Sequence, residues 1–153
     1  VGLLPGAGHP SRRWGLDKFG QLAHRLDDSG VRTAVLLGPE EVEMKESVRS
    51  LFPASTVVID DLRIPGLAAA ARFLSAVVTN DTGTMHLAAF AGAPILLLLD
   101  SRAPGTFLPR TEKLEVLRAD PVGAIGVDDA YEATASLMSR FGPLGEMTKA
   151  DPA

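Results

Sequence analysis

The segment Thr79-Asn80-Asp81-Thr82-Gly83-Thr84-Met85-His86-Leu87-Ala88-Ala89 decides how the rest of this chain is interpreted. One apolar run, residues 73–78, leads into it, and a second, residues 95–99, follows it. A strand that ends in Asn-Asp-Thr-Gly and turns directly into a helix points several backbone N–H groups at one place. Helix N-termini of this kind bind anions, phosphate above all. We therefore expect the diphosphate of a nucleotide to bind at this segment.

The composition is that of one globular domain. The chain has 153 residues, of which 46% are hydrophobic and 22% charged, enough for a sizeable core. The net charge of −4 implies no basic face for a nucleic-acid partner. The absence of cysteine excludes disulfides, thiolate metal sites and thiol nucleophiles, and fits a reducing compartment.

The apolar runs are too short for a membrane span, since the longest, residues 94–99, has the length of a strand. The chain begins with Val1 and an apolar stretch without a charged region, so we expect no signal peptide. Because it opens directly inside an expected strand, we expect it to be cut from a longer protein.

Short apolar strands alternate with helical patterns along the whole sequence. The expected strands are 1–4, 33–37, 56–59, 76–79, 95–99 and 114–117. The expected helices run from 16 to a stop at Gly30, and over 40–51, 65–73, 85–91 and 127–141. In the second of these helices, Val42, Val48 and Leu51 are expected to face inward.

Strands that are apolar on both faces and alternate with helices are typical of a parallel sheet covered on two sides. The fold class is therefore α/β: a Rossmann-like parallel sheet with helices on both faces, over residues 1–141, followed by a disordered tail over 142–153. Ligands of such sheets bind at the carboxyl ends of the strands. The loops at that edge are 6–14, 38–41, 60–65, 80–84 and 100–110.

The first of these loops contains Gly6-Ala7-Gly8. It resembles the start of the dinucleotide fingerprint Gly-x-Gly-x-x-Gly, but Ser11 occupies the third glycine position and the helix begins late. An NAD(P)- or FAD-binding oxidoreductase domain is thus a disfavoured alternative.

Arg12 and Arg13 lie in the same loop, and a guanidinium offers paired donors to phosphate. We predict that Arg12 stabilises a diphosphate leaving group, although a solvated arginine is the simpler alternative. Trp14, the single tryptophan, is predicted to anchor the loop by packing rather than to stack on a base.

The residues of the opening segment each have a structural alternative. Asp81 could cap the helix N-terminus, whereas Gly83 would let a phosphate approach the backbone closely. His86 could be a buried structural histidine, or it could donate a hydrogen bond to phosphate or ribose. We favour the ligand-binding interpretation for Asp81, Thr82, Gly83 and His86 together.

Several kinds of chemistry have no sequence support. The chain has no Asp-x-Asp and no His, Asp or Glu spacing that suggests a metal site. It also lacks the P-loop pattern and the Gly-x-Ser-x-Gly of serine hydrolases. Phosphate charge would have to be met by arginine and the helix dipole.

Two segments together resemble glycosyltransferase family 9, the ADP-heptose:lipopolysaccharide heptosyltransferases and their relatives. The first is Pro5-Gly6-Ala7-Gly8 with Arg12-Arg13-Trp14 and the helix that follows, and the second is Asn80 to Ala89. The resemblance runs from about residue 1 to residue 99, and more weakly to residue 117.

The resemblance implies a GT-B enzyme of two Rossmann-like domains, of which this chain is the C-terminal, donor-binding one. It implies metal-independent, inverting transfer of a sugar from a nucleotide diphosphate, with an ADP-linked donor, no cofactor and a role in lipopolysaccharide biosynthesis. The implied location is cytoplasmic, with attachment to the inner membrane surface through the full-length enzyme as an alternative. The acceptor site and the acidic general base would lie in the missing N-terminal domain. This chain alone is then expected to bind the donor without turnover.

The resemblance also implies roles for individual residues. Arg12 matches a basic residue, often lysine, that contacts the diphosphate, and Gly6, Ala7 and Gly8 of the same loop are expected to bind the donor. Asp81, Thr82, Gly83 and His86 match nucleotide-sugar contacts. Leu62 matches a residue beside the adenine, and Glu41 a ribose-binding acid.

The chain departs from the family pattern at three places. Arginine replaces lysine at position 12, and Gly15 replaces the proline that usually follows the tryptophan. The segment 99–104 replaces a Phe-Gly-Pro-Thr-like turn near the expected donor sugar, which leaves the identity of the sugar open. A non-catalytic interaction domain that kept the fold and lost the ligand is the remaining alternative.

Overall fold

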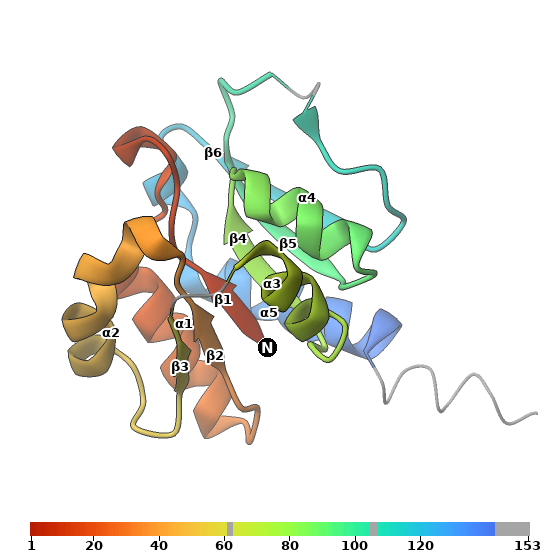
Figure 1. Cartoon of the computed structure of the whole chain (residues 1–153). Coiled ribbons are helices and arrows are strands. Elements are labelled where there is room, and N and C mark those ends of the chain that lie inside the picture. Colours follow the sequence, from red (N-terminus) through yellow and green to blue (C-terminus); the bar gives the residue numbers. More distant parts are fainter. Residues whose placement is uncertain (61–62, 105–106, 143–153) are drawn as a thin grey trace, which may run out of the picture.

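A six-stranded sheet forms the centre of the computed structural model (Figure 1), which describes residues 1–60, 63–104 and 107–142. All strand pairs are parallel and the strand order is β3-β2-β1-β4-β5-β6. The strands are β1 (Gly2–Leu4), β2 (Ala34–Leu36), β3 (Val57–Ile59), β4 (Val77–Asn80), β5 (Ile95–Asp100) and β6 (Leu114–Ala119). The helices are α1 (Leu16–Asp28), α2 (Lys45–Leu51), α3 (Ile64–Ala71), α4 (Gly83–Phe90) and α5 (Val127–Phe141). The predicted fold class is confirmed.

The strand order reverses between β1 and β4. The chain first builds outward from β1 through β2 to β3, and then returns to place β4 on the other side of β1, with Leu4 opposite Thr79. In open parallel sheets the connections diverge at such a reversal and leave a crevice at the carboxyl ends of the two strands. The loops after β1 and β4 border this crevice, and they are the two loops that the sequence singles out.

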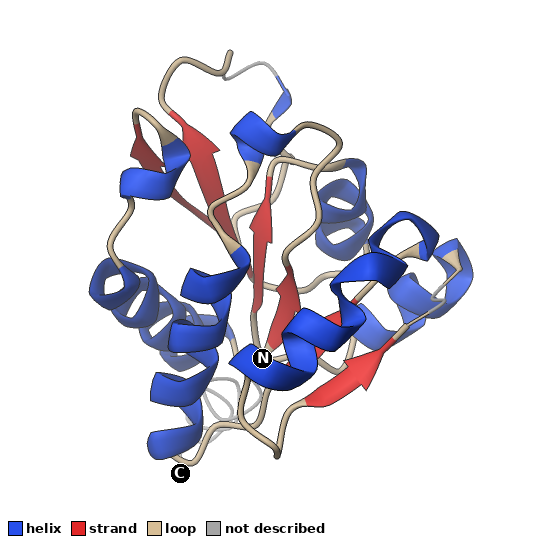
Figure 2. Ribbon diagram, turned by 90° about the vertical axis from the view of Figure 1, so that its left-hand side faces the viewer, coloured by secondary structure: helices blue, strands red, loops and turns tan. Residues whose placement is uncertain are grey.

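Helices cover both faces of the sheet, as Figure 2 shows. One face carries α1, α2 and α5, whose Phe19, Val48 and Leu137 belong to one buried cluster. The other face carries α3 and α4, and there Leu67 and Met85 belong to a second cluster. Every residue of β5 is buried, which explains why its sequence is apolar on both faces.

The segment predicted as one helix over 40–51 is two elements. A 3₁₀ helix, Pro39–Met44, precedes α2. A 3₁₀ turn has three residues per turn instead of 3.6, so the two parts do not share one helical face. Val48 is buried as predicted, but Val42 and Leu51 are 54% and 39% exposed, and the prediction that they face inward was wrong.

The remaining boundaries differ by a few residues. Pro65 is the second residue of α3, which begins at Ile64, and Phe73 lies beyond its end and is exposed. The last helix has the predicted bounds. Residues 143–153 lie outside the described part, so the disordered tail stays a prediction. Among the described residues, the helices fall short of the length and apolar character that crossing a membrane requires.

Candidate functional site

Asn80 joins the two loops at the crevice. Its side chain is fully buried at the end of β4. Its Oδ1 accepts a hydrogen bond from the Trp14 backbone N–H at 3.0 Å, and its Nδ2 donates to the Pro5 carbonyl at 2.8 Å. These bonds hold both ends of the glycine loop against β4. The sequence pattern predicted no separate role for Asn80, although a single amide directly after an apolar strand is a signal for such a linking residue.

The side chain of Trp14 also anchors the glycine loop. Its indole is 2% exposed, its Nε1–H donates to the Ile125 carbonyl at 2.9 Å, and its ring packs edge-on against Phe19 with centroids 5.1 Å apart. The predicted packing role is confirmed. The loop therefore has a fixed course between β1 and α1, with a 3₁₀ turn, Pro10–Arg12, at its tip.

The N-cap of α4 is Thr82. Its hydroxyl oxygen accepts a hydrogen bond from the Thr84 N–H at 3.0 Å, so Asp81 is not the cap and that alternative was wrong. The Asp81 carboxylate instead lies 3.5 Å from Nη1 of Arg12. Gly83, the first residue of α4, is exposed, and a Cβ there would meet nothing within 4 Å, so its backbone is open to close approach by a ligand.

A cavity of about 710 Å³, called cavity A here, lies over the crevice. Ile64 and Leu87, from α3 and α4, contribute its apolar wall. Its lining includes most of the predicted site residues: Ala7, Gly8, Arg12, Glu41, Asp81, Thr82 and Gly83. The structure thus brings together side chains from the loops after β1, β2 and β4.

Glu41 and Gly6 lie against each other beside cavity A, where both line a smaller pocket. Oε2 of Glu41 accepts a hydrogen bond from the Gly38 N–H at 2.7 Å. A Cβ built on Gly6 would lie 2.2 Å from Oε1 of Glu41, well inside van der Waals contact. Gly6 therefore makes room for a carboxylate that is held in a fixed position at the cavity wall.

We expect Gly6→Ala to push the Glu41 side chain out of its place and lower the free energy of unfolding by about 1 kcal/mol, the low end for overpacking because a flexible side chain can move. Gly8→Ala is the matched control, since a Cβ on Gly8 meets nothing within 4 Å. Urea unfolding of both variants measures the difference. If Gly6→Ala costs the same in a Glu41→Ala background, the clash is not with Glu41.

A second cavity of about 520 Å³, called cavity B, adjoins cavity A. Arg12 and Asp81 line both, so their ion pair stands between the two. The remaining lining residues of cavity B come from the glycine loop, from the end of β5 and from the loop that follows it: Ser11, Asp100, Arg102, Ala103, Pro104 and Phe107.

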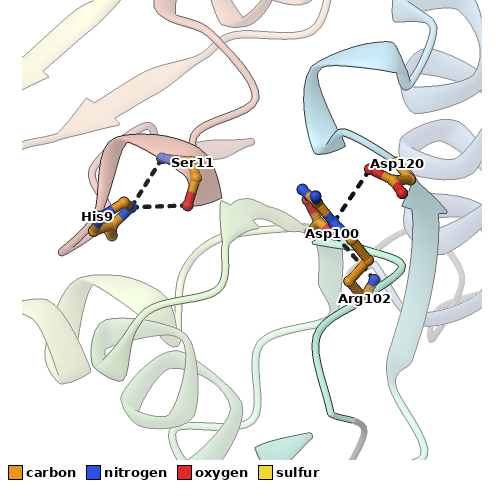
Figure 3. A network of polar contacts seen from close by, with 5 residues as sticks. All are labelled: His9, Ser11, Asp100, Arg102 and Asp120. Carbon is orange, nitrogen blue, oxygen red and sulfur yellow. Dashed lines mark hydrogen bonds and ion pairs between the residues drawn. The ribbon is translucent and has the colours of Figure 1, made fainter.

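Arg102 is the centre of a polar network at cavity B (Figure 3). Its Nε and Nη2 donate to the two carboxylate oxygens of Asp100 at 2.8 and 2.7 Å, and Oδ1 of Asp120 lies 3.2 Å from Nε. The hydrogen bonds and charge of Arg102 hold the pKa of Asp100 well below its usual range. Asp100 is therefore ionised at neutral pH.

Figure 3 also shows the tip of the glycine loop, where Nδ1 of His9 lies 2.8 Å from the Ser11 hydroxyl. The same Nδ1 accepts the Ser11 N–H at 3.2 Å, which caps the 3₁₀ turn Pro10–Arg12. Both residues are exposed. The contact accounts for the shape of the loop tip.

Gly6 and His86 are predicted residues that line neither cavity A nor cavity B, although Gly6 lines the smaller pocket beside cavity A. His86 is exposed on α4 and lines neither cavity. The alternative of a buried structural histidine was therefore wrong, and its contact with a ligand stays a prediction. Leu62 lies outside the described residues.

Within the described ranges, no three His, Asp or Glu side chains are grouped so that they could hold a metal ion. Cationic groups at the cavities come from Arg12 and Arg102. The metal independence that the resemblance implies stays a prediction.

Comparison with known proteins identifies the family. The model of glycosyltransferase family 9 (heptosyltransferase) matches residues 1–125. Lipopolysaccharide heptosyltransferase 2 of Escherichia coli K12 is 30% identical over an alignment of 131 residues, which covers 77% of this chain and 36% of that protein. The chain thus spans about a third of this curated relative.

Solved structures agree in fold. The E. coli ADP-heptose lipopolysaccharide heptosyltransferase II superposes with a TM-score of 0.84 at 21% identity, covering 95% of this chain and 46% of that one. An E. coli heptosyltransferase determined with ADP gives a TM-score of 0.80 at 22% identity, covering 89% of this chain and 43% of that one. With the family model matching most of its length, this chain belongs to glycosyltransferase family 9, the heptosyltransferase family.

Proposed function

We propose that this chain is the C-terminal, donor-binding domain of a heptosyltransferase-like, metal-independent, inverting glycosyltransferase, and that an ADP-linked sugar binds in cavities A and B. The observation that carries the proposal is the Arg12–Asp81 pair, which lies between two adjoining cavities at the strand-order reversal. Such an arrangement suits a ligand made of a nucleoside and a sugar joined by a charged group. An E. coli heptosyltransferase of the same fold was determined with ADP.

In this proposal the nucleoside occupies cavity A. The Glu41 carboxylate, fixed by the Gly38 N–H, accepts hydrogen bonds from the ribose hydroxyls. Ile64 and Leu87 supply apolar surface for the base. Such a mixture of apolar walls and a few fixed polar groups is typical of small-molecule sites.

The diphosphate lies at the boundary between the cavities. There Arg12 offers its guanidinium, and the start of α4 offers backbone N–H groups and the positive end of the helix dipole. When the bond between the sugar and the diphosphate breaks, negative charge develops on the departing phosphate oxygen. Arg12 stabilises that charge and so lowers the barrier without a metal ion.

The acceptor hydroxyl attacks the sugar carbon from the face opposite the diphosphate, which inverts the configuration. We place the acceptor site and the general base that removes the hydroxyl proton in a second, N-terminal domain of the full-length enzyme, which would act in lipopolysaccharide biosynthesis in the cytoplasm. This chain by itself is then expected to bind donor without transferring it.

Titration calorimetry of this chain with ADP, GDP, UDP and ADP-heptose tests the proposal. We expect ADP and ADP-heptose to bind, with GDP and UDP weaker. NADH is the control for a dinucleotide site, which the structure disfavours because α1 begins at Leu16 and not within the glycine loop. Absence of binding by ADP and ADP-heptose at millimolar concentration would refute the proposal.

A further inference from the structure

We propose that Arg102 is a specificity-determining residue of cavity B, where its guanidinium donates hydrogen bonds to hydroxyl groups of an uncharged donor sugar. The inference rests on the proposed function, since it assigns the sugar to cavity B. It concerns the loop after β5, one of the three places at which the sequence departs from the family pattern.

The position of Arg102 supports this role. Arg12 and Asp81 line cavity B together with Asp100 and Arg102. A sugar attached to a diphosphate at Arg12 would therefore extend directly into the space that Arg102 lines. The Arg102 side chain is 64% exposed and so is accessible to a ligand.

The orientation of the guanidinium is fixed before any ligand arrives. Asp100 accepts both side-chain bonds described above, and its Oδ1 also accepts the Arg102 backbone N–H at 2.9 Å. Asp100 is the last residue of β5, and Asp120 follows the end of β6, so the two anchors lie on neighbouring strands of the sheet. A side chain held in this way loses little conformational entropy when it binds.

Part of the guanidinium remains available. It has five N–H donors, and the contacts to Asp100 and Asp120 use those on Nε and Nη2. Among the described residues, no protein group accepts a hydrogen bond from Nη1 of Arg102. Two donors are thus free to meet a ligand on one rigid plane.

The charge at the site favours an uncharged partner. Arg102 is paired with two carboxylates, so these three side chains carry a net charge of −1, and the Arg12–Asp81 pair adds none. A carboxylate or a further phosphate would meet net repulsion here. Sugar hydroxyls can accept from Arg102 and donate to Asp81, so a neutral, hydroxyl-rich sugar satisfies both kinds of group.

Titration calorimetry on three variants of this chain tests the role of Arg102. With Arg102→Ala we expect the affinity for ADP-heptose to fall about tenfold, at the lower end for a hydrogen bond to a charged group because the site is exposed to water, and the affinity for ADP to change less than twofold. Arg102→Lys keeps the charge but not the planar guanidinium, and its affinity for ADP-heptose is expected to lie between those of the wild type and the alanine variant. Arg110→Ala is the matched control, because Arg110 is exposed at the end of the same loop and lines neither cavity.

Three other results would contradict the inference or the proposed function on which it rests. If Arg102→Ala weakens ADP and ADP-heptose equally, or leaves ADP-heptose unchanged, Arg102 only braces the loop and the inference is wrong. If a thermal melt shows that the alanine variant does not fold, Arg102→Lys takes its place. A larger loss of affinity for ADP-heptose than for ADP then supports the inference, and equal losses contradict it. Wild type that binds neither ligand would instead refute the proposed function.

A charged sugar tests the second half of the inference. We expect wild type to bind ADP-glucose at least as tightly as ADP-glucuronate. Tighter binding of the glucuronate that disappears in Arg102→Ala would show that the site recognises an anionic sugar, which overturns the assignment of a neutral one.

Discussion

Replacing Arg12 with alanine is expected to weaken ADP binding about 20-fold and to change adenosine binding less than twofold. The loss corresponds to about 1.8 kcal/mol, near the lower end for hydrogen bonds to charged groups. The lower end applies because the Arg12 side chain is 58% exposed and already contacts Asp81, so the diphosphate replaces one charged partner with another. Titration calorimetry with both ligands measures the ratio.

Arg13→Ala is the natural comparison. Arg13 is the neighbouring residue, but its Nε and Nη2 donate to the Ala7 carbonyl at 3.3 and 3.1 Å, and it lines neither cavity. Its loss is expected to loosen the glycine loop and to weaken ADP and adenosine alike. If Arg12→Ala behaved in that way, with equal losses for both ligands, its assignment to the diphosphate would be wrong.

Replacing Asn80 with leucine is expected to lower the free energy of unfolding by about 3 to 5 kcal/mol. Leucine has nearly the same shape, but it leaves the Trp14 N–H and the Pro5 carbonyl buried without the partners they have now. Each buried group without a partner costs about 1–3 kcal/mol. Because both ends of the glycine loop lose their attachment, ADP affinity should fall as well. Urea unfolding and calorimetry measure the two effects.

Thr79→Val provides the control for Asn80. Thr79 is the preceding residue of the same buried strand, and its hydroxyl donates to one carbonyl, that of Asn80, at 2.9 Å. We expect a loss of about 1 kcal/mol and unchanged ADP binding. A cost for Asn80→Leu no larger than that of Thr79→Val would contradict the linking role of Asn80.

The order of elements could be predicted because it depends on local patterns. The apolar strands and the face of α1 follow from hydrophobic periodicity, and the general rule for parallel sheets places the ligand at the carboxyl edge. One error arose where neighbouring residues compete for the same position. Asp81 and Thr82 are both good N-caps, and only the backbone course shows that Thr82 takes the position.

The contacts that define the candidate site could not be predicted in this way. Arg12 and Asp81 are far apart in the sequence and meet because β1 and β4 are neighbours. Asp120 reaches Arg102 because β5 and β6 pair along their length. Such pairs depend on the strand order, and the alternation of strands and helices leaves that order open.

The wall shared by the two cavities implies thermodynamic coupling between the parts of a bound donor. A phosphate that takes the guanidinium of Arg12 leaves the Asp81 carboxylate facing cavity B without its partner, where a hydroxyl donor then gains more by binding. A ligand bound in one cavity should therefore raise the affinity of the other cavity for its own ligand, and by linkage the effect must be reciprocal. The binding free energies of a nucleotide and a free sugar, each measured separately, would then sum to a weaker value than the binding free energy of the intact nucleotide-sugar.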